Sequence, residues 1–306
     1  MKETIHNVKA STQYKREHKA DYGKERIEIL YEDKDIVVIN KPSGMLSCPY
    51  PGSKARTAQD ILEKLMRSKG TYGPKHKPLV VHRLDRDTSG VMMFALNEIT
   101  QKQIMDTWHQ MVSERLYHAV AENPRDKAKA LPDSGLIDDP LAQNAHHVGY
   151  VKHDENDRAK TVPARTNYRV ILRGQTHTLF ELSLDTGKKN QIRAHLASKG
   201  YPLAGDENYR AHTDPFHRLA LHARTLEFTH PVTGKVMKFE VPEDEYWSKY
   251  VEKGDPHPEL PVWRDSKSEY NHPPRTEKTV STSARIPKKQ ASKMNFIEAG
   301  KARSKK

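Results

Sequence analysis

The sequence predicts an α+β fold in which helices flank a mixed, largely antiparallel central sheet. Segments with the two-residue apolar period of strands recur along most of the chain. Segments with helical spacing are fewer, and they fall between the strands singly or in pairs. Connections between the strands are short in some places and long in others, which favours antiparallel or mixed pairing over a regular parallel sheet.

The first half of the chain predicts strands interrupted by two helices. Thr57 is expected to cap a helix that ends at Gly70. Asn97 is expected to cap a second helix, whose apolar positions are Ile99, Ile104, Met105, Trp108 and Met111. The turn between the third and fourth strands begins at Asp85 and is short and polar. In chain order we expect strands at 27–32, 36–41, 79–84, 91–96 and 115–121.

The second half begins with a polar stretch, 123–162, that carries three prolines and few apolar residues. We expect loops or a weakly structured insertion there. Regular apolar periods then return, and Gly200 closes a short helix. The elements expected are strands at 166–172 and 177–184, a helix at 191–199, a hairpin of strands at 224–230 and 236–242, and a final helix at 243–252.

The chain carries a formal charge of +12, and most of the excess lies at its two ends. Residues 1–26 contribute +3 and residues 264–306 contribute +8, whereas 27–263 carry only +1. We therefore expect a flexible basic arm at 1–26, a catalytic domain at 27–254 and a disordered basic tail at 255–306. Such tails either bind a polyanion such as RNA or only keep the protein in solution.

The composition and the motifs of the chain argue against several classes of protein. The single cysteine, Cys48, excludes an internal disulfide framework and any Cys-rich zinc module, so we expect a cytoplasmic protein. The polar N-terminus and the lack of a long apolar stretch predict neither export nor a membrane partner. Phosphate-binding glycine loops and the usual zinc-protease and hydrolase motifs are missing, and pairs such as His146-His147 lack carboxylates at ligand spacing. We expect no metal site.

The chemistry centres on the run HRLDRDTSG at 82–90. A carboxylate at the start of a tight turn between two apolar strands is held at the rim of a sheet, and Arg83 and Arg86 beside Asp85 would keep it ionised. Taken alone, an aspartate in a turn more often accepts backbone hydrogen bonds. The other motifs of the chain decide between these interpretations.

The run resembles the signature H-R-L-D-x-x-T-S-G of the RluA-type pseudouridine synthases. Four further segments resemble that family in the family's order, so the resemblance covers about 27–251 and implies the pseudouridine synthase-like catalytic fold. The arm is too short for an S4 domain, so we expect none. The four segments are INKPSGMLSCP at 39–49, RLYHAVAE at 115–122, LDTGKKNQIRAHLASKGYPLAGDENY at 184–209 and LALHARTLEFTHPVTGKVMKFEVP at 219–242.

The resemblance implies an isomerase that converts uridine to pseudouridine without a cofactor. Asp85 would be the nucleophile, and Arg193 would pair with it and keep it charged. Tyr117 would lie against the uracil ring and is a candidate for the base that moves a sugar proton. Without the resemblance, Tyr117 could equally be an aromatic that fills a strand face.

The same resemblance implies an RNA partner, either ribosomal or transfer RNA. The shortage of a dedicated RNA-binding domain favours a compact stem-loop as the target, and we expect the protein to be a monomer. Arg83 would enter the space left by the flipped base, although a surface salt bridge is its simpler interpretation. The other candidate contacts to RNA phosphates, each of which could instead be part of a solvated basic face, are Lys41, Lys188, Lys189 and His222.

The chain departs from the family pattern next to Gln191, where Lys188 and Asn190 replace the usual Arg and His. Two alternatives to a synthase stay open. The first is a non-catalytic RNA-binding protein that retains the fold. The second is a metal-dependent RNA hydrolase that uses His82, Asp85 and Asp87, and sensitivity to EDTA would distinguish it.

Overall fold

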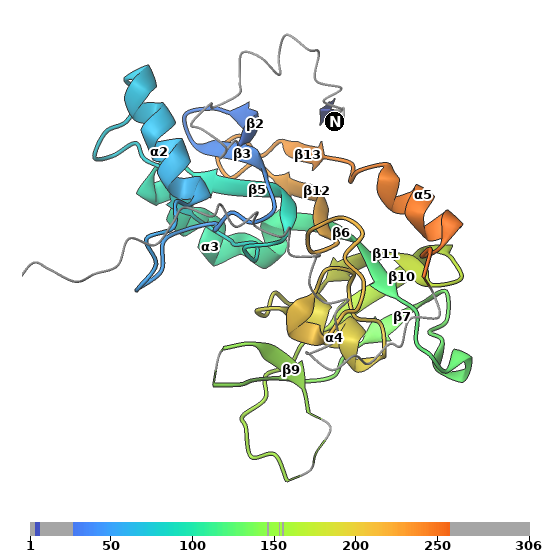
Figure 1. The fold of residues 1–306 in the computed structure, drawn as a ribbon. Helices are drawn as coiled ribbons and strands as arrows, with labels where there is room; N and C mark the ends of the chain where they lie inside the picture. The colour runs from blue at the N-terminus through green and yellow to red at the C-terminus, as the bar shows by residue number, and fades with distance from the viewer. Residues whose placement is uncertain (1–3, 7–26, 146, 153, 155, 258–306) are drawn as a thin grey trace, which may run out of the picture. The chain divides into compact units, whose positions relative to one another are not determined.

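The structure is a computed structural model, and it describes residues 4–6, 27–145, 147–152, 154 and 156–257 (Figure 1). These residues belong to the first of two compact units, Met1–Trp263. The second unit, Arg264–Lys306, lies outside the described residues, as do 258–263 and most of the predicted arm at 1–26. The flexible arm and the disordered tail therefore stay predictions, as does the domain boundary at 254.

One large mixed sheet forms the centre of the first unit, which confirms the predicted fold class. Its strands run in the order β2-β3-β5-β12-β6-β11-β10-β7, with β13 beside β12, β1 beside β13 and β4 beside β5. The pairs β5–β12 and β1–β13 are parallel and the other pairs are antiparallel. The strands are β1 Thr4–His6, β2 Glu28–Glu32, β3 Ile36–Lys41, β4 Leu79–Val80, β5 Ser89–Ala95, β6 Val112–Glu122, β7 Ser134–Ile137, β10 Thr166–Arg173, β11 His177–Leu184, β12 Leu221–Thr229 and β13 Val236–Glu240.

The helices begin and end largely where the sequence predicts. Thr57 and Asp60 form a capping box at the start of α2, and Gly70 ends that helix in a left-handed conformation. Asn97 caps α3 by accepting from the amide of Thr100. The α-helices are α2 Ala58–Lys69, α3 Glu98–Met111, α4 Gln191–Ser198 and α5 Tyr246–Lys253, and two short 3-10 turns are η1 Lys127–Lys129 and η2 Glu207–Tyr209.

Apolar side chains divide between the two faces of the sheet according to strand alternation. On one face, Ile39 and Phe94 pack with Ile61 of α2 and Leu196 of α4 in a single buried cluster. On the other, α3 packs against β3 and β5, and α5 covers part of β6 and β11. None of the helices among the described residues has the length and apolar character needed to cross a bilayer.

Two expectations about secondary structure were wrong, and the predicted arm, whose flexibility stays a prediction, contributes a short strand. The strand predicted at 79–84 ends after Val80, because the residues that follow bend away to form the turn that carries Asp85. The stretch 123–162, expected to be loops or a weakly structured insertion, contains β7 of the central sheet and a separate two-stranded ribbon, made of β8 Leu141–Gln143 and β9 Gly149–Val151. Thr4–His6 pairs with β13 although it lies in the predicted arm. Such short strands are too brief to produce a clear period.

Candidate active site

Asp85 lies in the turn between β4 and β5, and the central sheet holds the end of that turn at Gly90. Gly90, near the start of β5, pairs with Ala223 of β12, which in turn pairs with Tyr117 of β6. Gly90 has a φ of +115°, and a Cβ at this position would lie 2.1 Å from the carbonyl oxygen of Ala223. Only glycine allows this approach, which holds the end of the turn one strand away from Tyr117.

Lys41 at the end of β3 holds the turn from the other side. Its buried ammonium donates to the carbonyl oxygens of Pro42 at 2.9 Å, Met45 at 2.7 Å and Arg86 at 3.0 Å. Burial lowers the pKa of Lys41 to about 7, although Asp87 and Asp85 pull it upward. All three N–H donors are used inside the protein, so the prediction of a direct phosphate contact for Lys41 is not supported.

Two serines complete the attachment of the turn to the segment after β3. Ser47 donates to the carbonyl oxygen of Leu84 at 2.8 Å and accepts from the amide of Leu84 at 3.1 Å. Ser43 donates to the carbonyl oxygen of Asp87 at 2.7 Å. The backbone on both sides of Asp85 is therefore bound to one neighbouring segment, which orients its carboxylate rigidly.

The Asp85 carboxylate meets an amide and a guanidinium at the start of α4. Its Oδ2 accepts from Nδ2 of Asn190 at 2.9 Å and lies 3.8 Å from Nη1 of Arg193. Arg193 makes its closer, bidentate pair with Asp206, at 2.6 and 2.7 Å. The predicted Arg193–Asp85 pair thus exists only as the longer contact. Burial alone would lower the pKa of Arg193, but the bonds to Asp206 outweigh it and raise that pKa, so the cation beside Asp85 is permanent.

A cavity of about 470 Å³ opens above Asp85. Tyr117 lines it and is 9% exposed. Burial raises the pKa of Tyr117, and the nearby Asp85 raises it further against the opposing effect of Arg115. The phenol therefore keeps its proton at neutral pH, so it can donate a hydrogen bond, and it would need an acceptor of its own proton to act as a base.

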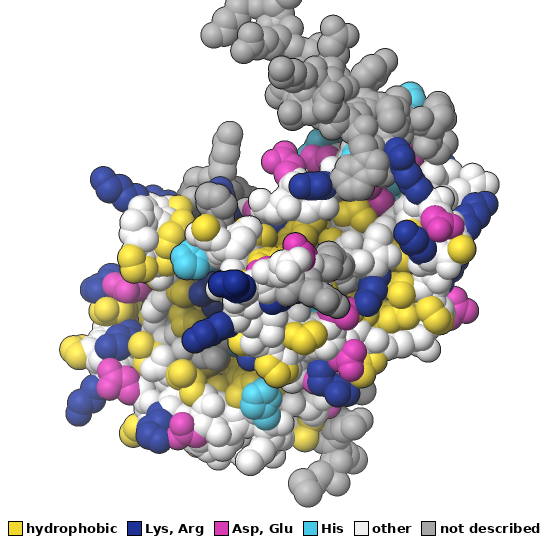
Figure 2. Space-filling view, turned by 90° about the horizontal axis from the view of Figure 1, so that it is seen from below, with side chains coloured by type: hydrophobic (Ala, Val, Ile, Leu, Met, Phe, Trp, Pro, Cys, Tyr) yellow, Lys and Arg dark blue, Asp and Glu magenta, His cyan; other side chains and the backbone are white. Residues whose placement is uncertain are grey.

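Basic side chains surround the cavity. Arg83 and Lys188 are exposed and line it, and Lys189 is exposed next to them. The loop that carries both lysines is fixed from inside by Gln191, which accepts from the amide of Lys188 and donates to the carbonyl oxygen of Arg165. Figure 2 shows the side of the molecule on which α3, α4 and β9 lie, with Lys and Arg side chains spread over it among apolar ones. A polyanion can reach these cations.

His222 does not belong to this basic rim. Its Nδ1 lies 2.7 Å from the hydroxyl of Ser89, its Nε2 lies 2.8 Å from the carbonyl oxygen of Val241, and the residue is buried. Burial lowers its pKa to about 4, so the ring is neutral at pH 7. The prediction that His222 contacts an RNA phosphate is therefore not supported, for the same reason as for Lys41.

Sequence reasoning missed three residues that complete the site. Asp206 holds Arg193, Asn190 holds Asp85, and the ring of Tyr209 lies 5.1 Å from the Arg193 guanidinium. Asp206 and Tyr209 fall in the GDENY part of the motif at 184–209, so the motif contained them without indicating their role. Asn190 stood out only as a departure from the family pattern.

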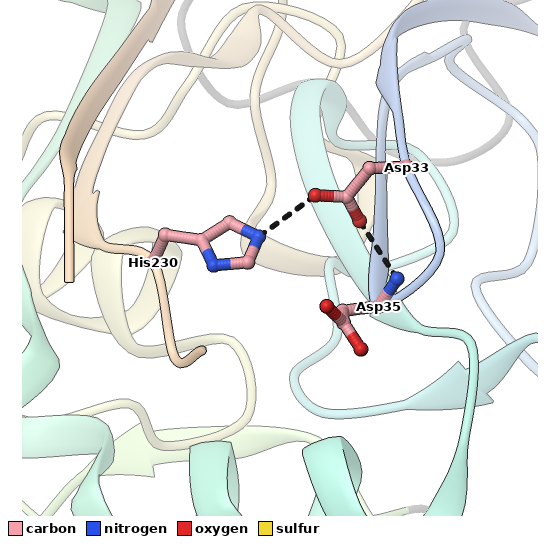
Figure 3. A group of neighbouring side chains, drawn as sticks. All are labelled: Asp33, Asp35 and His230. Carbon is pink, nitrogen blue, oxygen red and sulfur yellow. Dashed lines mark hydrogen bonds and ion pairs between the residues drawn. The ribbon is translucent and has the colours of Figure 1, made fainter. Parts of the chain in front are cut away.

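Within the described ranges, His82, Asp85 and Asp87 do not form a possible metal site. His82 instead accepts the amide of Met93 on Nε2 at 2.9 Å. Among the residues that the structure describes, the one group of three candidate ligands with atoms within 4.8 Å of one another is Asp33, Asp35 and His230 (Figure 3).

The arrangement in Figure 3 does not suit a metal ion. His230 accepts the amides of Val232 and Thr233 on Nδ1, so its proton is on Nε2 and is donated to Asp33 at 2.9 Å. A metal would need the lone pair at that nitrogen. The cluster instead joins the turn before β3 to the hairpin of β12 and β13.

A family model described as RNA pseudouridylate synthase matches residues 35–198, which include Asp85, Tyr117 and Arg193. The chain is also 34% identical over 233 residues to YlyB of Bacillus subtilis, an uncharacterized RNA pseudouridine synthase, and the match covers 74% of this chain and 72% of the relative. The chain belongs to the RNA pseudouridylate synthase family. The resemblance inferred from the five motifs is thereby confirmed, and so is the expected class of enzyme, an RNA pseudouridine synthase and hence an isomerase.

Other members of the RNA pseudouridylate synthase family show the same relationship. The ribosomal large subunit pseudouridine synthase D of Pseudomonas aeruginosa is 34% identical over 237 residues, covering 72% of this chain and 70% of that protein. The solved human RNA pseudouridylate synthase domain containing 4 has the same fold, with a TM-score of 0.57 at 23% identity over 72% of this chain and 89% of that one. The family assignment implies RNA as the substrate.

Proposed function

We propose that this pseudouridine synthase isomerises specific uridines of a structured RNA with Asp85 as its nucleophile. The observation that carries the proposal is the position of Asp85 at the base of a cavity, where its carboxylate is 21% exposed and lies beside the buried Arg193. A carboxylate that lies next to a permanent cation, yet is open to a cavity, is available for attack on a bound nucleoside.

The reaction breaks the bond between C1′ of the ribose and N1 of uracil and makes a bond between C1′ and C5. No electrons are gained or lost overall, and the proton removed from C5 is balanced by one gained at N1. Asp85 supplies an electron pair to the sugar or the base and recovers it when the new bond has formed. The cation of Arg193 keeps the departing carboxylate stable. Tyr117 lies against the uracil ring in this scheme.

The basic rim suits an RNA backbone. Arg83 is placed to enter the space that the target base leaves when it flips, because it is exposed at the mouth of the cavity. Lys188 and Lys189 would contact phosphates, since both are exposed on the loop next to Asp85's partner Asn190.

Several relatives are named for the ribosomal large subunit, including those of Pseudomonas aeruginosa and Nitrosomonas europaea. We therefore favour ribosomal RNA over transfer RNA as the substrate of this chain. We further propose that the enzyme acts in the cytoplasm as a monomer, since one molecule contains all the groups named above.

The test compares the wild-type protein with Asp85→Asn. Ribosomal and transfer RNA from cells with and without the gene is mapped for pseudouridine by carbodiimide modification and primer extension, and purified protein is then supplied with unmodified RNA. We expect at least one site to disappear without the gene and to be restored in vitro. Asp85→Asn should lower turnover by at least about 10³-fold while changing RNA affinity by less than about tenfold, because it removes the nucleophile and little of the binding surface.

Two results would contradict the proposal. If every pseudouridine persists without the gene and the pure protein leaves unmodified RNA unchanged, the isomerase function is wrong for this chain. If Asp85→Asn keeps wild-type turnover, another group is the nucleophile.

A further inference from the structure

The two-stranded ribbon of β8 and β9 is hydrogen-bonded to Asn190 and Tyr209 through the backbone of one residue, Gly149. The amide of Gly149 donates to Oδ1 of Asn190 at 3.4 Å, and its carbonyl oxygen accepts from the hydroxyl of Tyr209. Figure 1 shows β9 directly beside α4. A Cβ on Gly149 would lie 2.6 Å from the carbonyl oxygen of Lys189, so only glycine allows the ribbon to pack this closely.

Both partners of Gly149 also touch the catalytic pair. Asn190 donates from Nδ2 to Asp85 at 2.9 Å, so one amide side chain bridges the nucleophile and the ribbon. The ring of Tyr209 lies 5.1 Å from the guanidinium of Arg193. Burial raises the pKa of Tyr209, so its hydroxyl keeps the proton that it donates to Gly149.

The backbone conformation at position 190 favours asparagine, the residue whose side chain bridges Asp85 and Gly149. Asn190 precedes α4 with φ 58° and ψ 20°, a left-handed conformation that asparagine tolerates better than most residues. It is only 8% exposed. The amide makes no cap hydrogen bond to α4, and both of its polar ends are instead used toward Asp85 and Gly149.

We propose that Asn190 is a positioning residue for Asp85 and that it ties the nucleophile to the β8–β9 ribbon, so that RNA seated on the ribbon aligns the carboxylate. This inference rests on the proposed function. The ribbon and the loop after it present exposed polar and basic groups to such a partner: Gln143, Asn144, His147, Arg158 and Lys160. An amide donates at every pH, whereas the histidine that the family usually has at this position would titrate.

The first test replaces the amide in two ways. Asn190→Asp keeps the shape and removes the donor, and Asn190→Gly removes the side chain while allowing the left-handed backbone. A hydrogen bond to a charged group is lost in both, so we expect kcat to fall by about 10- to 100-fold with KM within about threefold of wild type.

The pH profile separates positioning from a loss of stability. A carboxylate at position 190 disfavours the ionised form of Asp85, so the acidic limb of kcat should move upward by about one pH unit in Asn190→Asp and not in Asn190→Gly. The other charged or titratable groups that face Asp85 are unchanged in both variants: Lys41, Tyr117, Arg193 and Tyr209. Wild-type kcat and an unmoved limb in Asn190→Asp, or a change confined to KM, would overturn the inference.

A matched pair of tyrosines tests the ribbon. Tyr209→Phe removes the hydroxyl that binds Gly149, and Tyr250→Phe removes a hydroxyl that binds Asp255 at 2.5 Å, outside the ribbon. We expect Tyr209→Phe to lower kcat by about three- to tenfold and Tyr250→Phe to change it by less than about twofold. Equal effects of the two changes would contradict a specific link through Gly149.

A measurement without substrate separates this inference from the proposed function. The carboxyl carbon of Asp85 and the amide of Gly149 are followed by NMR in the wild-type protein and in Asn190→Asp. Both signals should shift together, and the pKa of Asp85 should rise. If neither changes, the bridge is wrong even for an active enzyme; if both change but no uridine is isomerised, only the proposed function fails.

Discussion

Asp33 and Asp85 each lie next to a cationic or histidine partner, and they differ in what their carboxylate oxygens do. Asp33 accepts four hydrogen bonds, from the amides of Asp35 and Ile36, the hydroxyl of Tyr31 and the ring of His230. Asp85 accepts one, from Asn190, in the described part of the chain. The two side chains are almost equally exposed, at 24% and 21%.

Exposure therefore does not distinguish a structural carboxylate from a reactive one here. The lone pairs of Asp33 are occupied by the turn that it stabilises, so nothing is left for a ligand. Asp85 keeps acceptor capacity, faces a cavity of about 470 Å³, and has a cation held in place by another residue. Carboxylate oxygens that can still accept hydrogen bonds and that face a cavity make Asp85 the candidate for a function, and Asp33 lacks them.

The largest effect should come from removing the residue that holds the cation. Asp206→Asn removes the paired carboxylate of the buried Arg193, so the 3.8 Å contact to Asp85 is its remaining ion pair among the described residues. We expect the free energy of unfolding, measured with urea, to fall by about 3–5 kcal/mol. Turnover should fall as well, because Arg193 is free to move onto Asp85.

A surface pair provides the control for that experiment. Arg169 and Glu181 form an ion pair in which Arg169 is 63% exposed, so Arg169→Gln should cost less than about 1 kcal/mol. If Asp206→Asn lowers the free energy of unfolding by no more than this control does, the buried Arg193 does not need Asp206 as its partner.

A smaller effect, on stability alone, is expected at the structural cluster. Asp33→Asn replaces one acceptor oxygen by an NH2 group, which cannot accept the hydrogen bonds that reach that position. The free energy of unfolding should therefore fall by about 2–3 kcal/mol at pH 7, while activity stays within about twofold. Burial alone would raise the pKa of Asp33, but its hydrogen bonds lower it below 3.8. The wild-type advantage is thus present above that pH and shrinks as the pH falls through the folded-state value.

Urea unfolding of both proteins at pH 7 and pH 3 checks this prediction. A loss of activity comparable to that of Asp85→Asn would remove the contrast between the two carboxylates.

The smallest effect concerns the histidine in the wall of the cavity. Burial, with a further contribution from Arg115, lowers the pKa of His82 to about 3, against 6.5 ordinarily. Between pH 6.5 and about 3, His82 is protonated in the unfolded chain and neutral in the folded protein. Each pH unit of acidification in this range therefore lowers the free energy of unfolding by about 1.4 kcal/mol. His82→Gln keeps an acceptor for the Met93 amide and should reduce the slope between pH 6.5 and 4.5 by that amount. Equal slopes would mean that His82 is charged in the folded protein.

Much of the fold could be predicted because its signals are local. Thr57 and Asn97 cap helices by bonding backbone amides three residues ahead, and such contacts can be recognised in a short stretch of sequence. The long strands reveal themselves by alternation, as in the opposite faces of Val37 and Val38. Asp85 could be predicted as the nucleophile because the motif around it is specific.

The rest depends on partners that are distant along the chain. Lys41 was predicted to bind RNA because a lysine normally carries its charge on the surface, but one of its acceptors, the carbonyl of Arg86, is 45 residues away. Asp206 captures Arg193 because the loop after α4 turns back over that helix, and nothing local indicates it. Ile99 and Met105 were expected on the apolar face of α3 yet are 83% and 58% exposed, because a helical period does not show which side meets the sheet.

The ammonium of Lys41, bonded to three carbonyl oxygens beneath the turn, has a consequence for the choice of RNA. A turn fastened in this way cannot extend outward to meet a base inside a helix. All of the deformation must then occur in the nucleic acid, where unstacking a base costs a few kcal/mol. Uridines that are already loose, in hairpin tips or bulges, lose the least on entry, so the rigidity of the protein would itself select among sites before any sequence is read.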